Sequence, residues 1–341
     1  MIATIGLDLA KNVFQIHGVD ARGHVVMKKT LRRAQVLTFF GQLPPCLVGM
    51  EACGGAHFWA RKLQGFGHTV RLMAPQFVKP YVKSQKNDAA DAEAICEAVT
   101  RPSMRFVPIK SIDQQAILAV HRVRQGLVKL RTAQVNQLRC LLAEVGLVLP
   151  RGIQHIRRVP LLLDEAADTL PTAFCLLMRQ QYESIRDLDR RIAELEGDIR
   201  RWHRENTSSR RLAEIPGVGP LTASALVATI GDASTFDNGR QLAAWIGLVP
   251  RQCSSGGKPR LLGIGKRGDG YLRGLLVHGA RSIIASSKRH LGAHTSGWLG
   301  RLLVRRHVNI AIVAQANRTA RIVWALLRHG DTYRGAGACA A

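Results

Sequence analysis

The stretch from residue 2 to residue 31, IATIGLDLAKNVFQIHGVDARGHVVMKKTL, decides the fold of the N-terminal part of the chain. It contains three runs rich in apolar and β-branched residues, at 2–10, 13–20 and 24–31, separated by short polar turns. Such runs favour strands, and tight turns with glycine join neighbouring antiparallel strands. We therefore expect a three-stranded antiparallel meander.

The next seventy residues continue with alternating helical and strand patterns. The expected elements are a helix at 32–43, a strand at 46–52, a helix at 56–67, a strand at 68–75 and a helix at 88–100. The expected order is three strands, then a helix, a strand, a helix, a strand and a helix. This order is typical of a mixed sheet covered by helices. The sequence predicts an α/β domain over residues 1–107.

The middle of the chain, residues 108–206, is predicted to be helical. Apolar residues recur at spacings of three and four over 116–146 and again over 182–205, and glycine and proline are scarce there. These patterns indicate two long amphipathic helices, packed antiparallel on each other or on a partner chain. A dimerising coiled coil is one interpretation.

Composition excludes several classes of protein. A hydrophobic content of 46% excludes a wholly disordered chain, and a mean hydropathy near zero (−0.01) excludes a bundle of membrane helices. The N-terminus has no basic region before its apolar residues, so it does not resemble a signal peptide. The seven cysteines are scattered without a CxxC pair, which favours reduced thiols over a structural zinc site. We expect a cytoplasmic protein.

Charge points to the class of partner. The chain has 49 Lys and Arg against 24 Asp and Glu, a formal net charge of +25. Between Asn238 and Gly330 there are 16 basic residues and one acid, Asp269. Basic side chains displace counterions from phosphates, so nucleic acid is the natural partner and an association with the nucleoid is expected. A membrane surface is the weaker alternative, since no exposed amphipathic anchor is evident.

The C-terminal part, residues 207–330, is predicted to be mainly α-helical, with a frayed tail at 331–341. Residues 212–232, LAEIPGVGPLTASALVATIGD, have the form of a helix-hairpin-helix, in which Gly217 and Gly219 permit a tight turn. Backbone amides at the start of the second helix could then face a phosphate. An ordinary helical hairpin is the alternative.

Four carboxylates form a candidate metal site. Asp8 lies between apolar residues of the first strand, Glu51 ends another strand, and Asp88 and Asp91 share one face of a helix. Asn87 could cap that helix, and acids in its first turn would suit its dipole, which is a purely local explanation. Carboxylates on adjacent elements repel unless cations neutralise them, and hard oxygen ligands suit magnesium or manganese. Two such ions could support phosphodiester cleavage.

A second candidate is the glycine-rich loop at 251–269, RQCSSGGKPRLLGIGKRGD. Ser254 and Ser255 are the potential nucleophiles, and glycines allow a close backbone approach to a phosphate. A serine needs an activator, and no His or Asp is obvious beside the two serines, so a phosphate-binding loop is an equal alternative. The basic residues expected to contact nucleic acid are Arg251, Lys258, Arg260, Lys266, Arg267 and Arg273.

These motifs together resemble a known family. The four acids resemble the DEDD set of a RuvC-like nuclease with an RNase H fold. They are the Asp in IGLDLAK, the Glu in GMEACGG and the DxxD pair in KNDAADAEA. Sugar kinases and actin-like ATPases also open with a strand Asp, but they follow it with glycines and Thr or Ser. Including IPGVGPLTA and the serine loop, nearly the whole chain resembles the DEDD-type transposases of insertion sequences, relatives of Piv-like DNA invertases.

The resemblance implies a function. It implies magnesium bound by Asp8, Glu51, Asp88 and Asp91, and Ser255 as the nucleophile, with Ser254 as the alternative. It also implies a bridge RNA that selects donor and target DNA, and a homo-oligomer, dimer to tetramer, that joins the RuvC-like domain of one subunit to the serine domain of another. A RuvC-like nuclease or junction resolvase using metal-activated water is the alternative enzyme. An architectural nucleic-acid-binding protein is the alternative without catalysis.

Overall fold

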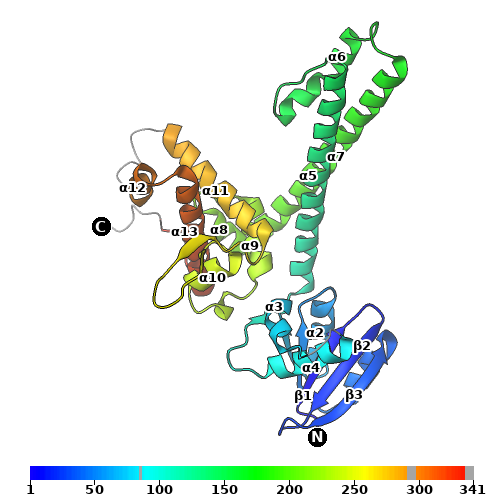
Figure 1. Ribbon diagram of the computed structural model, residues 1–341, viewed down its shortest axis with the longest axis vertical. Helices are drawn as coiled ribbons and strands as arrows, with labels where there is room; N and C mark the ends of the chain where they lie inside the picture. Colours follow the sequence, from blue (N-terminus) through cyan, green and yellow to red (C-terminus); the bar gives the residue numbers. More distant parts are fainter. Residues whose placement is uncertain (84–86, 290–296, 335–341) are drawn as a thin grey trace. The chain divides into compact units, whose positions relative to one another are not determined.

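The computed structural model describes residues 1–83, 87–289 and 297–334 (Figure 1). The chain divides into two compact units, Met1–Ile112 and Asp113–Ala341. Most of the predicted tail, residues 335–341, lies outside the described residues, whereas Tyr333 packs against the C-terminal core. Among the described helices, none is long and apolar enough to cross a bilayer.

The first unit is built on a six-stranded mixed sheet of order β3-β2-β1-β4-β5-β6. The expected meander is confirmed, since β2 pairs antiparallel with both β1 and β3, while β1, β4 and β5 are parallel. The short last strand, antiparallel to β5, was not predicted because two residues carry no periodicity. The strands are β1 (Thr4–Leu9), β2 (Val13–Val19), β3 (Val25–Arg32), β4 (Leu47–Glu51), β5 (Thr69–Met73) and β6 (Phe106–Val107).

Helices cover both faces of this sheet. Ile5 and Leu7 of β1 point to one face, where they are fully buried with Trp59 and Leu63 of α2. The opposite face is covered by α4, whose Ile95 and neighbours form a separate apolar cluster. The helices of this unit are η1 (Arg33–Gln35), α1 (Val36–Gly41), α2 (Ala56–Gln64), α3 (Pro75–Val78), η2 (Lys79–Tyr81) and α4 (Asp88–Val99).

Two glycines let α4 lie directly on the sheet. A Cβ atom added at Gly6 of β1 would fall 2.1 Å from the Ala92 carbonyl oxygen, and one at Gly49 of β4 would fall 2.7 Å from Val99 Cβ. No side chain larger than hydrogen fits at such distances without moving the helix. The position of α4, and of the acids in its first turn, therefore depends on Gly6 and Gly49.

The second unit begins with an antiparallel pair of long helices, α5 (Ile112–Glu144) and α7 (Thr172–Glu205) (Figure 1). Leu127 of α5 packs in one apolar cluster with Leu188 of α7, and Leu138 of α5 packs in another with Met178 of α7. Residue numbers therefore rise along α5 where they fall along α7, as in an antiparallel pair. The antiparallel alternative is thus confirmed within one chain. The connection contains η3 (Ile153–Arg158) and α6 (Val159–Glu165), which the sequence patterns did not predict.

The rest of the second unit is mostly helical and surrounds one apolar core. The predicted loop at 251–269 instead contains a two-stranded antiparallel hairpin. The elements are α8 (Thr207–Ala213), α9 (Pro220–Ile230), η4 (Ala233–Thr235), α10 (Gly239–Ile246), β7 (Pro250–Gln252), β8 (Leu261–Ile264), α11 (Gly270–Arg289), α12 (Trp298–Arg305) and α13 (Val308–His329).

The apolar spacing of residues 302–329 predicts one continuous helix, and this prediction is wrong. Arg306 has extended backbone angles (φ −138°, ψ 150°), so α12 ends there. The His307 side chain then caps α13 by accepting a hydrogen bond from the Asn309 amide at 3.2 Å. The break is a capping effect that helical periodicity does not reveal.

Candidate functional site

The structure brings Asp8 and Glu51 together at the carboxyl ends of adjacent parallel strands. Leu7 is in register with Met50, so the next residues along β1 and β4 are Asp8 and Glu51. Since side chains alternate along a strand, both carboxylates point to the α4 face, opposite the buried Leu7 and Met50. Partial burial, and after it the negative charges of Glu51 and Asp8, raise the pKa of the nearby Cys53 thiol.

The helix α4 runs antiparallel to β1, which directs its first turn toward Asp8. The Cys96 sulfur donates to the Thr4 carbonyl at 3.8 Å, and Ala92 lies against Gly6. Two residues along a strand and four along a helix advance by about the same 6–7 Å. Because Ala92 lies against Gly6, the residue four positions earlier on the helix, Asp88, is expected near the residue two positions later on the strand, Asp8.

The remaining acids of this region differ in their surroundings. Asp88 is exposed and Asp91 is half-buried, and the Asn87 side chain accepts from the Ala90 amide at 2.8 Å, which is the expected cap. Glu93 lies 3.4 Å from the ammonium group of Lys83. Within the described residues, no group of three or more His, Cys, Asp or Glu side chains is arranged to hold a metal ion. The structure thus pairs Asp8 with Glu51 without closing a four-carboxylate site.

The serine-bearing segment forms the tip of the β7–β8 hairpin. Gly256 and Gly257 have φ angles of 57° and 73°, and the Lys258 amide donates to the Ser255 carbonyl at 3.1 Å. Two consecutive residues with positive φ make a two-residue hairpin turn that glycine adopts without strain. Residues 251–260 are all exposed, so the hairpin presents its tip to solvent.

The two serines differ in their hydrogen bonds. The Ser254 hydroxyl oxygen accepts from the Gln252 side-chain amide at 3.0 Å and from the Arg260 backbone amide at 3.2 Å. The Ser255 hydroxyl, at the first position of the turn, makes no side-chain hydrogen bond within the described part of the chain. Ser254 therefore stabilises the hairpin, whereas Ser255 is exposed at its tip.

The base of the hairpin is fixed to the end of α10. Arg273 Nη1 donates to the carbonyls of Ile246 at 2.9 Å and Arg267 at 3.1 Å. A Cβ atom at Gly268 would fall 1.8 Å from the Trp245 carbonyl oxygen, so the two segments touch through their backbones. Arg273 thus has an internal anchoring contact, and its predicted contact with nucleic acid stays a prediction. Arg251, Lys258, Arg260, Lys266 and Arg267 are exposed around the hairpin.

The glycines of the α8–α9 turn have separate roles. Gly217 (φ 78°) packs on α11, where a Cβ atom added at Gly279 would lie 2.0 Å from the Gly217 carbonyl oxygen. Gly219 is exposed and precedes α9, and a Cβ atom added there would meet no described atom within 4 Å. The helical hairpin is therefore present, and its open end is at Gly219.

A buried polar network that the sequence patterns did not reveal holds these elements together. His121 of α5, 1% exposed, contacts the Tyr271 hydroxyl with Nδ1 and the Ser224 hydroxyl with Nε2, both at 3.0 Å. The Ser224 hydroxyl donates its one proton to the Pro220 carbonyl at 2.7 Å, so toward His121 it can only accept, from Nε2–H. The Nδ1 atom of the neutral ring then has no proton, and it accepts from the Tyr271 hydroxyl. Periodicity marks His121 only as one buried position of a long helix.

This network should make stability depend on pH. Burial, and after it the positive charge of Arg124, lowers the pKa of His121 to about 4. Because the unfolded chain binds this proton near pH 6.5, unfolding is favoured as pH falls from about 6.5 toward 4. We expect His121 to remove about 2 kcal/mol of unfolding free energy between pH 7 and pH 4.5. Urea denaturation at both pH values should show this loss in the wild type and a smaller one in His121→Gln; equal losses would contradict it.

Comparison with known proteins follows the same division of the chain. A family model described as "Transposase" (DEDD type, IS110) matches residues 5–146, and one described as "Transposase IS116/IS110/IS902 family" matches residues 209–295. The chain is 53% identical over 335 residues to a "Probable family 20 transposase" of Pseudomonas aeruginosa, covering 98% of this chain and 99% of that protein.

Two further relatives differ in how much of the chain they match. A "Transposase for insertion sequence element IS1111A" of Coxiella burnetii is 44% identical over 337 residues, with 98% of this chain and 92% of the relative covered. A "Pilin gene-inverting protein" of Moraxella lacunata is 38% identical over 79 residues, which is 23% of this chain and 24% of that protein.

Proposed function

This chain belongs to the IS116/IS110/IS902 family of insertion-sequence transposases, which act on DNA, and on that premise we propose how it cuts and rejoins DNA. The proposal is a recombinase with an RNase H-like, RuvC-like N-terminal domain and a serine nucleophile in the C-terminal part. The observation that supports it most is the exposed Ser255 at a glycine turn surrounded by basic side chains.

We propose that Asp8 and Glu51, together with Asp88 and Asp91, hold a divalent cation, Mg²⁺ or, as a fitting substitute, Mn²⁺. Oxygen donors are the ligands these ions prefer, and the sheet already places Asp8 beside Glu51. Such an ion, when bound, supplies positive charge that neutralises a phosphate. The carboxylates orient the site, and the antiparallel course of α4 directs Asp88 toward it.

The proposed reaction starts at Ser255. Its hydroxyl oxygen attacks the phosphorus of a DNA phosphodiester, a Ser–O–P bond forms and the P–O bond to one sugar breaks. The hydroxyl proton leaves Ser255, and the departing sugar oxygen ends as a hydroxyl. Exposed guanidinium and ammonium groups of Arg251, Lys258 and Arg260 can stabilise the charged phosphate. The covalent link conserves the bond energy for rejoining.

We further propose that a bridge RNA selects the DNA sequences on which the protein acts. We also propose that the active oligomer is a dimer or tetramer, with α5 and α7 as a coiled-coil contact between subunits. A net charge of +25 with 5% aromatic residues suits a protein with many phosphate contacts and few stacking contacts. The α8–α9 hairpin, with the exposed Gly219 directly before α9, would act as a helix-hairpin-helix contact to DNA.

A covalent adduct is the decisive test. Wild-type protein, purified with its bound RNA and incubated with element DNA and Mg²⁺, should give a protease-sensitive protein–DNA species after denaturation. Cleavage without any such species would favour a RuvC-like nuclease that uses metal-activated water. The absence of Mg²⁺-dependent cleavage under all conditions would favour an architectural nucleic-acid-binding protein.

A further inference from the structure

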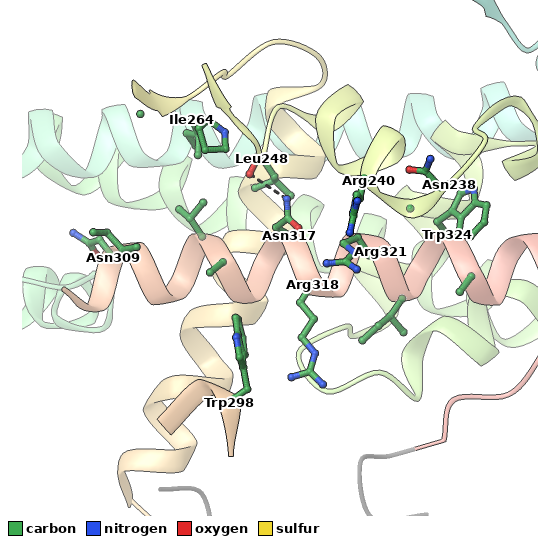
Figure 2. Close-up of a pocket in the computed structure, with 18 of the residues that line it drawn as sticks. Asn238, Arg240, Leu248, Ile264, Trp298, Asn309, Asn317, Arg318, Arg321 and Trp324 are labelled. Carbon is green, nitrogen blue, oxygen red and sulfur yellow. Dashed lines mark hydrogen bonds between the residues drawn. The ribbon is translucent and has the colours of Figure 1, made fainter. Parts of the chain in front are cut away.

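A groove of about 1420 Å³ runs along α13 beneath the β7–β8 hairpin (Figure 2). Its floor is one face of α13, with Ile310, Val313 and Ala314 toward one end and Ile322 and Ala325 toward the other. These residues recur at helical spacing over 16 positions, which corresponds to a length of about 22 Å. The walls are the start of α10 and the hairpin on one side and Trp298 of α12 on the other.

The charged residues that line the groove are all arginines. Arg240, Arg318 and Arg321 are exposed, and no Asp or Glu of the described residues lines the groove. Gly239 packs on the Arg321 backbone, where an added Cβ atom would be 2.9 Å from Arg321 Cα, so Arg240 and Arg321 lie in the same part of the groove (Figure 2). Neither is within ion-pair distance of a carboxylate in the described residues. Clustered cations without acids favour a bound anion.

An aromatic side chain lies beside this charge. Trp298 is 39% exposed, and the Arg318 guanidinium lies 5.4 Å from the centroid of its ring. Trp324, by contrast, donates from its indole nitrogen to the Phe236 carbonyl at 3.0 Å, which fixes it to the fold. Trp298 is therefore a partly exposed aromatic side chain with a cation over its ring, and nucleobases stack on aromatic and guanidinium groups of this kind.

We propose that this groove binds an unpaired DNA strand of about four nucleotides, with bases against Trp298 and the apolar floor and phosphates against the three arginines.

Other occupants fit the lining less well. The bases of a duplex are stacked inside it, so a duplex cannot place them against the apolar floor of the groove. An uncharged apolar protein segment would use the floor but leave three arginines without counter-charge. The family acts on DNA, which favours a DNA strand over RNA, and the contribution of the 2′-hydroxyl is measured in the test below.

This inference rests on the proposed function in one respect. Pro250 and Ile264, at the base of the hairpin that carries Ser255, form part of the groove wall. An unpaired strand in the groove would thus lie at the base of the hairpin whose tip carries the proposed nucleophile. The strand would be the one separated from its partner beside the scissile phosphate.

The test is a binding measurement that needs no chemistry. Full-length Ser255→Ala protein, kept in EDTA, is titrated into a fluorescein-labelled oligothymidylate of about eight nucleotides and into a labelled duplex. Trp298→Ala should weaken binding of the single strand about tenfold or more and leave duplex binding within about twofold. Trp298→Phe, which keeps an aromatic face, should restore most of the affinity.

Matched controls come from the same unit. Trp245 is 38% exposed but lies outside the groove against Phe236, so Trp245→Ala should leave single-strand binding unchanged. Arg318→Ala should weaken single-strand binding more than Arg328→Ala, an exposed arginine of the same helix outside the groove.

Several outcomes would overturn the inference. They are unchanged single-strand affinity in a folded Trp298→Ala protein, an equal loss of duplex binding, and tighter Trp298-dependent binding of oligouridylate than of oligothymidylate. A drop in molecular mass of Trp298→Ala by light scattering would instead assign the groove to a contact between protein chains. Because binding is measured without metal or Ser255, these results are independent of whether a covalent adduct forms.

Discussion

Ser255→Ala is expected to abolish the covalent protein–DNA adduct and to lower the rate of strand cleavage by about four orders of magnitude or more, the scale of removing an enzymatic nucleophile. The reason is local: Ser255 stands at the first position of an exposed glycine turn, and the described structure gives its hydroxyl no side-chain hydrogen bond. Adduct formation is measured by denaturing gel with end-labelled element DNA, and binding of the same DNA should be unchanged.

Ser254→Ala is the matched control, one residue away on the same hairpin. This change removes the acceptor for Gln252 and for the Arg260 amide, two exposed hydrogen bonds worth about 1 kcal/mol each. The adduct should still form, at a rate reduced less than about tenfold. If Ser254→Ala abolishes the adduct and Ser255→Ala retains it, the assignment of the nucleophile is reversed. If both variants cleave normally, a serine nucleophile is excluded.

Periodicity was sufficient for the N-terminal fold. Alternation of apolar residues over 2–31 predicted the meander, and the alternating helices and strands that follow predicted a mixed sheet, because packing on a sheet imposes that order. The β7–β8 hairpin was not predicted, since Gly256, Gly257 and the exposed strands beside them have no buried face to create an alternating pattern.

The candidate site was predicted only as a set of residue types. Sequence spacing could name Asp8 and Glu51, but their adjacency follows from the register of β1 and β4. The close approach of α4 to the sheet depends on Gly6 and Gly49, two glycines that look like ordinary strand residues in the sequence. The His121 network is likewise tertiary, because its three members come from positions 121, 224 and 271. Long-range contacts of this kind leave no local signal.

Asp8→Asn should lower Mg²⁺-dependent strand cleavage by about a thousandfold or more, equivalent to about 4 kcal/mol of transition-state stabilisation. The change keeps the size of the side chain and removes one charge at the point where β1 and β4 place two carboxylates side by side. The rate is measured on supercoiled element DNA across a range of Mg²⁺ concentrations. Binding of that DNA should persist, because the basic residues of both units are unchanged.

Two further variants separate a metal role from general damage. Glu93→Gln removes a charge from the same helix, but Glu93 pairs with Lys83, so cleavage should stay within about threefold of wild type. Gly6→Ala retains all four carboxylates but forces α4 away from β1, since its Cβ atom would fall 2.1 Å from the Ala92 carbonyl oxygen. It should therefore reduce cleavage as Asp8→Asn does. Cleavage at the wild-type rate in Asp8→Asn would place the metal elsewhere, and normal cleavage in Gly6→Ala would show that α4 and its acids take no part.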